Sequence, residues 1–188
     1  CLVSLTFIAC NNDDDLTDNQ VVYTSGTADF SKFVAVGNSL TAGYTDGALF
    51  IKGQENSYPN ILAQQFSLAG GGAFTTPYMA DNLGGIVVGS TQVVENRLFF
   101  NGSGPQRLPG TPTTSATTVL TGPFNNMGVP GAKSFHLNLA GYGALNVYYG
   151  RFASSPTAKI IDDAVAQNPT FFSLWIGNND VLSFATNG

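Results

Sequence analysis

Two short apolar runs and two amphipathic segments dominate the hydrophobic pattern of the chain. Residues 30–37 and 171–176 are compact apolar runs with aromatic and β-branched side chains; the first ends at Gly37 and the second is followed by Gly177. Runs of this length and composition predict buried β-strands. Residues 57–68 and 154–167 place their apolar side chains at helical spacing instead. This pattern predicts a helix in each segment.

Residues that favour helix ends support both helix predictions. Pro59 stands near the start of the first segment, and the glycine-rich residues 69–72 end it. In the second segment we expect Ser155 to cap the helix and Pro156 to occupy its first position. Residues 168–169, Asn-Pro, are then expected to stop it.

The order of these elements indicates the fold class. A strand and a helix are followed by a long intervening stretch, then by another helix and strand, which predicts an α/β fold of three layers with a parallel sheet. Residues 70–123 hold few charges and many Gly, Thr, Pro and Asn residues. This stretch is too long for an ordinary connection, so we interpret it as an insertion with short strands at 85–88 and 91–94.

The first residues are typical of an export signal. Residues 2–9 are apolar and end in small residues at Cys10, and residues 11–15 are all Asn or Asp. The pattern resembles the tail of a secretory signal peptide with a lipoprotein cleavage box, in which Cys10 becomes the lipidated first residue. Residues 1–9 are then a signal-peptide remnant and residues 10–29 a tether. The alternative is an apolar N-terminus with an ordinary thiol.

Lipidation at Cys10 implies a place in the cell. We expect an exported lipoprotein of a Gram-negative bacterium, held by its lipid anchor at the outer membrane, on the cell surface or the periplasmic face. The rest of the chain contains no run of 18 or more apolar residues. The sequence therefore predicts no membrane-spanning helix.

Charge and motif content exclude several classes of function. The formal net charge is −5, only 10% of the residues are charged, and lysine and arginine form no cluster. Nucleic-acid binding requires such cations, so no nucleic-acid partner is expected. The glycines at 70–72 lack dinucleotide-binding spacing, and no cluster of His, Cys or carboxylates has metal-ligand spacing. The sequence therefore implies no metal and no other cofactor.

Three polar segments carry the candidate chemistry. Residues 36–44 contain Ser39 directly after the first predicted strand, and residues 175–180 follow the last predicted strand. Residues 125–132 form a glycine-punctuated segment that we interpret as a turn with a backbone N–H available to a ligand. The carboxyl ends of parallel strands meet at one edge of a sheet, where open α/β folds bind ligands. We therefore expect the first and last of these segments to lie together.

In their order and content these segments resemble the SGNH (GDSL-type) hydrolase family of esterases and lipases. The resemblance extends from about residue 33 to residue 180, with a poorly matching insertion between the first two blocks. It implies that Ser39 in Gly-Asn-Ser-Leu is the nucleophile. It also implies that the Gly128 backbone N–H and the Asn179 side chain stabilise the oxyanion. The expected activity is hydrolysis of carboxylic esters through an acyl-serine intermediate.

The sequence departs from the family pattern at two places. Asn38 stands where the family most often has Asp, and we expect its side chain to order the turn through a bond to the backbone. The late Asp-x-x-His block of the family has no counterpart here, and His136, the only histidine, lies in the second-block region. We interpret His136 as a packed or surface residue, and we expect that the chain is truncated after residue 188 and almost inactive alone.

Two other classes of function stay open at the level of sequence. The first is a non-catalytic surface lipoprotein that binds glycan or lipid on the same fold, because fold does not dictate function. The second is a purely structural surface protein, which explains the composition but not the three ordered blocks. For the enzyme, the substrate is a small-molecule, glycan or lipid ester, and the sequence does not distinguish these.

Overall fold

The structure is a computed structural model that describes residues 21–187. Residues 21–29 form no helix or strand. The predicted lipidation site Cys10 and the acidic residues 13–15 lie outside the described residues. Between residues 21 and 187, no helix has the length and apolar character needed to cross a bilayer.

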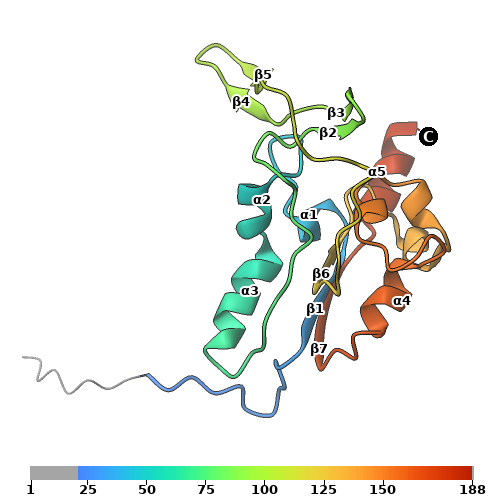
Figure 1. Ribbon diagram of the computed structural model, residues 1–188. Coiled ribbons are helices and arrows are strands. Elements are labelled where there is room, and N and C mark those ends of the chain that lie inside the picture. Colours follow the sequence, from blue (N-terminus) through green and yellow to red (C-terminus); the bar gives the residue numbers. More distant parts are fainter. Residues whose placement is uncertain (1–20, 188) are drawn as a thin grey trace, which may run out of the picture.

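A parallel sheet of three strands lies at the centre of the described chain (Figure 1). Its strands are β1 (Phe33–Gly37), β6 (Asn126–Gly128) and β7 (Phe171–Trp175), in the order β6-β1-β7. Both neighbours of β1 are parallel to it. The predicted α/β class with a parallel sheet is thus confirmed. Residues 126–128, which we expected to form a turn, are a strand instead, because they pair with Ala35, Val36 and Gly37 of β1.

Helices lie on both sides of this sheet (Figure 1). One side carries α1 (Ser39–Ala42), α2 (Ile51–Glu55) and α3 (Tyr58–Ser67), and the other carries α4 (Ile160–Val165). Helix α5 (Asn178–Asn187) follows β7. Three short 3₁₀ helices connect β6 to α4: η1 (Ser134–Asn138), η2 (Tyr142–Ala144) and η3 (Tyr149–Arg151).

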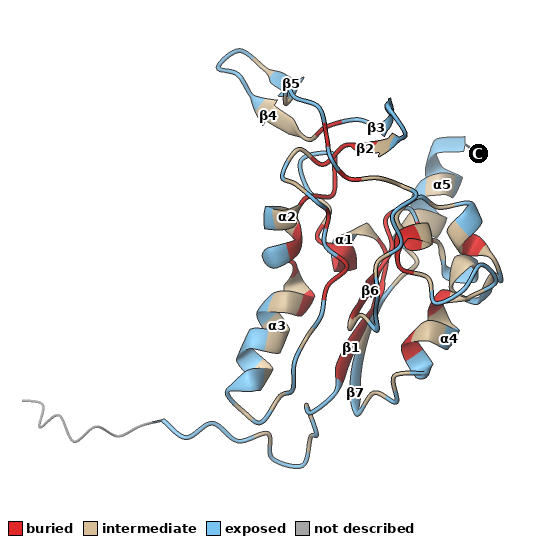
Figure 2. Cartoon of the chain, in the orientation of Figure 1, coloured by how far each residue is buried: buried red, intermediate tan, exposed pale blue. Residues whose placement is uncertain are grey.

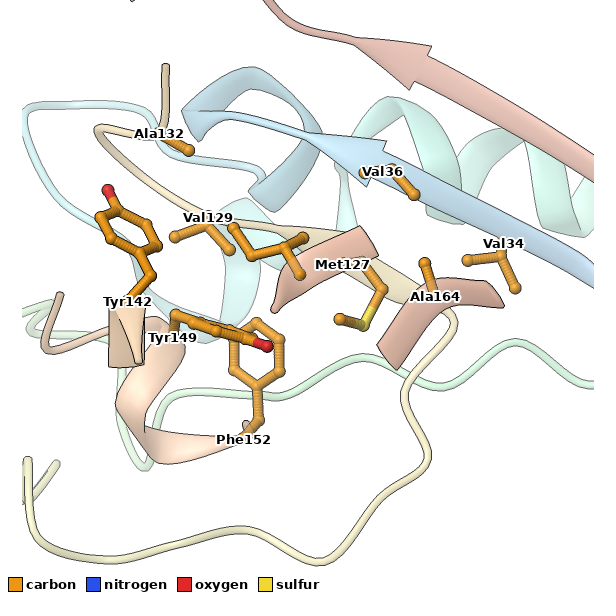
Figure 3. Packing of buried hydrophobic residues seen from close by; sticks show 10 residues of the cluster. Val34, Val36, Met127, Val129, Ala132, Tyr142, Tyr149, Phe152 and Ala164 are labelled. Carbon is orange, nitrogen blue, oxygen red and sulfur yellow. The ribbon is translucent and has the colours of Figure 1, made fainter. Parts of the chain in front are cut away.

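Strand β1 is buried on both faces (Figure 2). Val34 and Val36 belong to a cluster that includes Met127 of β6 and Ala164 of α4 (Figure 3). On the opposite face the ring of Phe33 lies 5.1 Å from the ring of Phe66 in α3, in an edge-to-face arrangement. Alternate side chains of a strand point to opposite faces. The apolar run of β1 therefore fills two interfaces at once.

The prediction that the last strand is buried is wrong. In β7 only Ser173 is not exposed, and Phe172 keeps 64% of its surface accessible (Figure 2). Within the described part of the chain, β7 has a neighbouring strand on one edge only, namely β1. A continuous apolar run is typical of a strand covered on both faces. The run indicates the right element here but not its burial.

The second helix is shorter than the sequence predicts. Helix α4 begins after Lys159, which is extended and acts as its N-cap, so Ser155 and Pro156 lie outside the helix. The Ser154 hydroxyl donates to the Asp163 carboxylate at 2.5 Å, and the Gly141 N–H donates to the carbonyl of Ala158. These bonds hold residues 154–158 in turns. The first helix agrees with the prediction, because α3 has its proline in the first turn.

Residues 70–123 contain two small antiparallel ribbons. The first pairs β2 (Ile86–Val88) with β3 (Thr91–Val94), as the sequence predicts, and the second pairs β4 (Leu98–Phe100) with β5 (Pro105–Arg107). Both ribbons lie beyond the end of the sheet where β1 leads into α1 (Figure 1).

Candidate functional site

The three candidate residues belong to the carboxyl ends of three adjacent parallel strands. Gly37, the last residue of β1, pairs with Gly128 of β6 on one side and with Trp175 of β7 on the other. Neighbouring strands lie about 4.8 Å apart. Ser39 follows Gly37 by two residues, and Asn179 follows Trp175 by four. The fold thus places all three segments at the same edge of the sheet.

Hydrogen bonds join the segments that leave these strands. The Asn38 side-chain amide donates to the Asn178 side-chain oxygen at 3.2 Å, and the Asn38 N–H donates to the Trp175 carbonyl at 3.2 Å. On the other side, the Val129 N–H donates to the Gly37 carbonyl at 2.9 Å. Ser39 and Asn179 are therefore the chain neighbours of two residues that are bonded to each other.

Ser39 is the first residue of a helix that Asn38 caps. The buried Asn38 side-chain oxygen accepts from the Leu40 N–H at 3.0 Å, so the prediction that Asn38 orders the turn is confirmed. Ser39 itself is half-buried. Its hydroxyl and its N–H have no hydrogen-bond partner among residues 21–187. Both groups are therefore available to a ligand, as first-turn N–H groups of helices commonly are.

The turn before Ser39 is expected to lose stability when Asn38 is replaced by alanine. The Asn38→Ala variant loses the cap on Leu40 and the bond to Asn178, and removal of a cap costs about 1 kcal/mol. Urea unfolding measures this loss as a lower midpoint. The Asn38→Asp variant keeps an oxygen for the cap and is expected to unfold closer to the unmodified protein. Equal midpoints for the alanine variant and the unmodified protein would contradict the capping role.

The N–H of Gly128 is not free, contrary to the expectation for an oxyanion donor. It donates to the Asn126 side-chain oxygen at 3.0 Å, while the Asn126 amide donates to the Thr41 carbonyl at 3.0 Å. A Cβ atom on Gly128 would lie 2.6 Å from the Ala42 Cα. The structure therefore assigns Gly128 a steric role, which is to let α1 pack directly against β6.

Asn179 is held by one of its two amide hydrogens. Its Nδ2 donates to the Ala132 carbonyl at 2.8 Å. The Ala132 N–H in turn donates to the Val129 carbonyl in the segment after β6. Because an amide NH₂ group has two donors, this bond orients the side chain and leaves one hydrogen for another acceptor.

The His136 side chain makes its contacts within the protein, as a residue with a structural role does. Its Nδ1 accepts from the Lys133 N–H at 3.0 Å, and its ring stacks on Tyr142 with centroids 4.2 Å apart. Burial lowers the pKa of His136, which favours the neutral ring. Nearby, Asp180 accepts from the Ser134 N–H and hydroxyl, and these bonds lower the pKa of Asp180. These contacts join η1 to the start of α5.

A cleft of about 540 Å³ lies close to the first turn of α1. It is lined by Leu40, the residue after Ser39, by Trp175 at the end of β7, and by residues of α2 and α3. A larger cavity of about 820 Å³ lies at the opposite end of the sheet. Its lining includes Lys32, Asn125 and Asn168, which precede β1, β6 and β7. Of these two, only the smaller cleft is lined by a residue next to a candidate site residue, namely Leu40 after Ser39.

Two residues that organise this site were absent from the sequence prediction. Asn126 joins β6 to α1, and Asn178 joins the start of α5 to Asn38. Each stands in an Asn-Asn pair, at residues 125–126 and 178–179, and this repetition is the signal in the sequence that indicates them. In residues 21–187, no three His, Cys, Asp or Glu side chains lie together in a way that would hold a metal ion. No family model, curated protein or solved structure matches the chain.

Proposed function

We propose that this protein is a serine acylhydrolase that cleaves carboxylic esters, with Ser39 as the nucleophile. The observation that carries the proposal is the bond between Asn38 and Asn178. It joins the chain neighbour of Ser39, whose hydroxyl has no partner among residues 21–187, to the chain neighbour of Asn179, whose amide has a spare hydrogen. The helices on both sides of the sheet also fit the three-layer arrangement that the SGNH resemblance implies.

The reaction has two mirrored steps. The Ser39 hydroxyl oxygen attacks the ester carbonyl, its proton passes to a base, and the carbonyl oxygen becomes the oxyanion of a tetrahedral intermediate. The carbon–oxygen bond to the alcohol then breaks, and the alcohol leaves with the proton. Water attacks the acyl-serine in the same way and releases the acid, which restores the Ser39 hydroxyl.

The oxyanion needs donors that already point to where its charge develops. We assign this role to the Ser39 N–H and to the second hydrogen of the Asn179 amide, because neither has a partner in the described residues. The Gly128 N–H is available only after Asn126 releases it. Two of the three proposed donors are therefore free, and the third requires Asn126 to release the Gly128 N–H.

The described residues do not supply the base that accepts the Ser39 proton. His136 has its Nδ1 bound to Lys133 and its ring stacked on Tyr142. The SGNH resemblance places the base in an Asp-x-x-His block that follows the third block. Tests of activity therefore use the protein expressed from its complete natural reading frame, hereafter the extended protein.

Replacing Asn179 by alanine is expected to lower kcat of the extended protein for ester hydrolysis about a hundredfold or more. The variant removes a donor that acts on the developing oxyanion, so KM is expected to change little. Initial rates over a range of ester concentrations separate the two constants. Asn187→Ala is the matched control, because Asn187 is an exposed asparagine at the far end of the same helix. An unchanged kcat for Asn179→Ala would remove this residue from the mechanism.

The alternative function is non-catalytic binding of glycan or lipid at the same site. It predicts that the extended protein binds its ligand and has no Ser39-dependent turnover. Hydrolysis of p-nitrophenyl esters by the unmodified extended protein and by its Ser39→Ala variant distinguishes the two functions.

A further inference from the structure

The cleft beside Ser39 has walls that are mainly apolar and aromatic. Leu40 is 45% exposed and Trp175 is 46% exposed, and both line the cleft together with Phe50 and Tyr58. The rings of Tyr58 and Trp175 lie 5.4 Å apart and are tilted against each other. Large side chains with this much exposed surface gain free energy when an apolar group covers them.

The polar side chains of the cleft are largely engaged within the protein. The Tyr44 hydroxyl donates to the Gly47 carbonyl at 2.7 Å, and the Asn56 amide donates to the Lys52 carbonyl at 2.8 Å. The Tyr58 hydroxyl lies 3.1 Å from the Thr41 hydroxyl. A sugar needs several convergent hydrogen-bonding groups, because its buried hydroxyls are costly when unpaired. Apart from the Lys52 ammonium and the Thr45 hydroxyl, which line the cleft without a partner among residues 21–187, these walls offer apolar surface instead.

We propose that this cleft binds the acyl chain of the ester, so that the substrates are esters of medium-chain fatty acids rather than acetyl esters of sugars. The proposal rests on the proposed function, because the cleft begins at Leu40, directly after the nucleophile. An acyl group attached to Ser39 then extends along Leu40 toward Trp175. A cleft of about 540 Å³ falls within the range of small-molecule sites.

Binding can be measured without any chemistry because Trp175 is the only tryptophan of the chain. Octanoate below its micelle concentration is titrated into the extended protein, and the tryptophan fluorescence is followed. If the extended protein contains further tryptophans, the difference from its Trp175→Phe variant isolates the signal of Trp175. We expect a saturable blue shift with octanoate and none with acetate. No saturable change with octanoate would overturn the proposal, as would a saturable change with maltotriose instead.

A matched pair of variants locates the binding. Leu40→Gln places an amide in the cleft wall at similar size, and we expect it to weaken octanoate binding about tenfold, which is the loss of nearly two buried methylenes. Leu145→Gln is the control, because Leu145 is an exposed leucine that does not line the cleft. Equal affinity of both variants for octanoate would overturn the assignment of the cleft.

The chain-length dependence of hydrolysis tests the same cleft in the enzyme. With p-nitrophenol as the constant alcohol, kcat/KM is expected to rise about fourfold per methylene from acetate toward octanoate. A flat or falling series overturns the proposal and leaves the esterase function standing. If octanoate binds but no ester is hydrolysed, the assignment of the cleft stands and the proposed esterase function fails.

Discussion

Replacing Ser39 by alanine is expected to reduce ester hydrolysis by the extended protein about 10⁴-fold or more, because the acyl-enzyme then has no oxygen on which to form. The fold is expected to survive. The Ser39 hydroxyl makes no hydrogen bond within residues 21–187, so its removal breaks none among these residues. The free energy of unfolding should change by about 0.5 kcal/mol or less. Initial rates with p-nitrophenyl octanoate, measured beside thermal unfolding, test both statements.

A surface serine provides the control for this result. Ser103 is exposed in the loop between β4 and β5, and Ser103→Ala is expected to keep full activity. A Ser39→Ala rate within tenfold of the unmodified rate would exclude Ser39 as the nucleophile. Equal losses in both variants would indicate an effect other than the missing hydroxyl.

Replacing Gly128 by alanine is expected to destabilise the protein by about 3 kcal/mol, near the upper end for overpacking. The added Cβ would meet the Ala42 N and lie 2.6 Å from the Ala42 Cα and from the Thr41 carbonyl carbon. These are backbone atoms, which cannot rotate away as a side chain can. In a protein of this size the melting temperature should fall by roughly 6–12 °C.

The control for Gly128 is a glycine with open space around it. No heavy atom outside its chain neighbours would lie within 4 Å of a Cβ on Gly104, so Gly104→Ala should leave the melting temperature nearly unchanged. If Gly128→Ala keeps its stability and loses only activity, the steric role is wrong and the predicted role of the Gly128 N–H in the oxyanion site is favoured.

The sequence predicts those elements whose side chains decide their structure locally. The apolar run of β1 and the proline near the start of α3 are examples, and both elements occur where expected. The start of α4 depends instead on contacts between distant residues, such as the Gly141 N–H bonded to the carbonyl of Ala158. The exposure of β7 depends on the number of neighbouring strands. Local patterns contain no information on either.

The candidate site was predictable to the extent that strand ends determine it. A serine and an asparagine that follow neighbouring parallel strands must lie at one edge of the sheet, and Ser39 and Asn179 do so. The hydrogen-bond partner of a single N–H could not be predicted in this way. Gly128 donates to Asn126 because a side chain two residues away happens to reach it, and motif spacing does not indicate such a contact.

If Ser39 forms a covalent acyl intermediate during ester hydrolysis, a fluorophosphonate should label the same oxygen. Its phosphorus is attacked by an activated serine oxygen, fluoride leaves, and the adduct persists. The extended protein is treated with the reagent, digested and analysed by mass spectrometry. We expect one adduct, on the peptide that contains Ser39, and none in the Ser39→Ala variant. Ester hydrolysis accompanied by an adduct on another residue, or by no adduct, would contradict it.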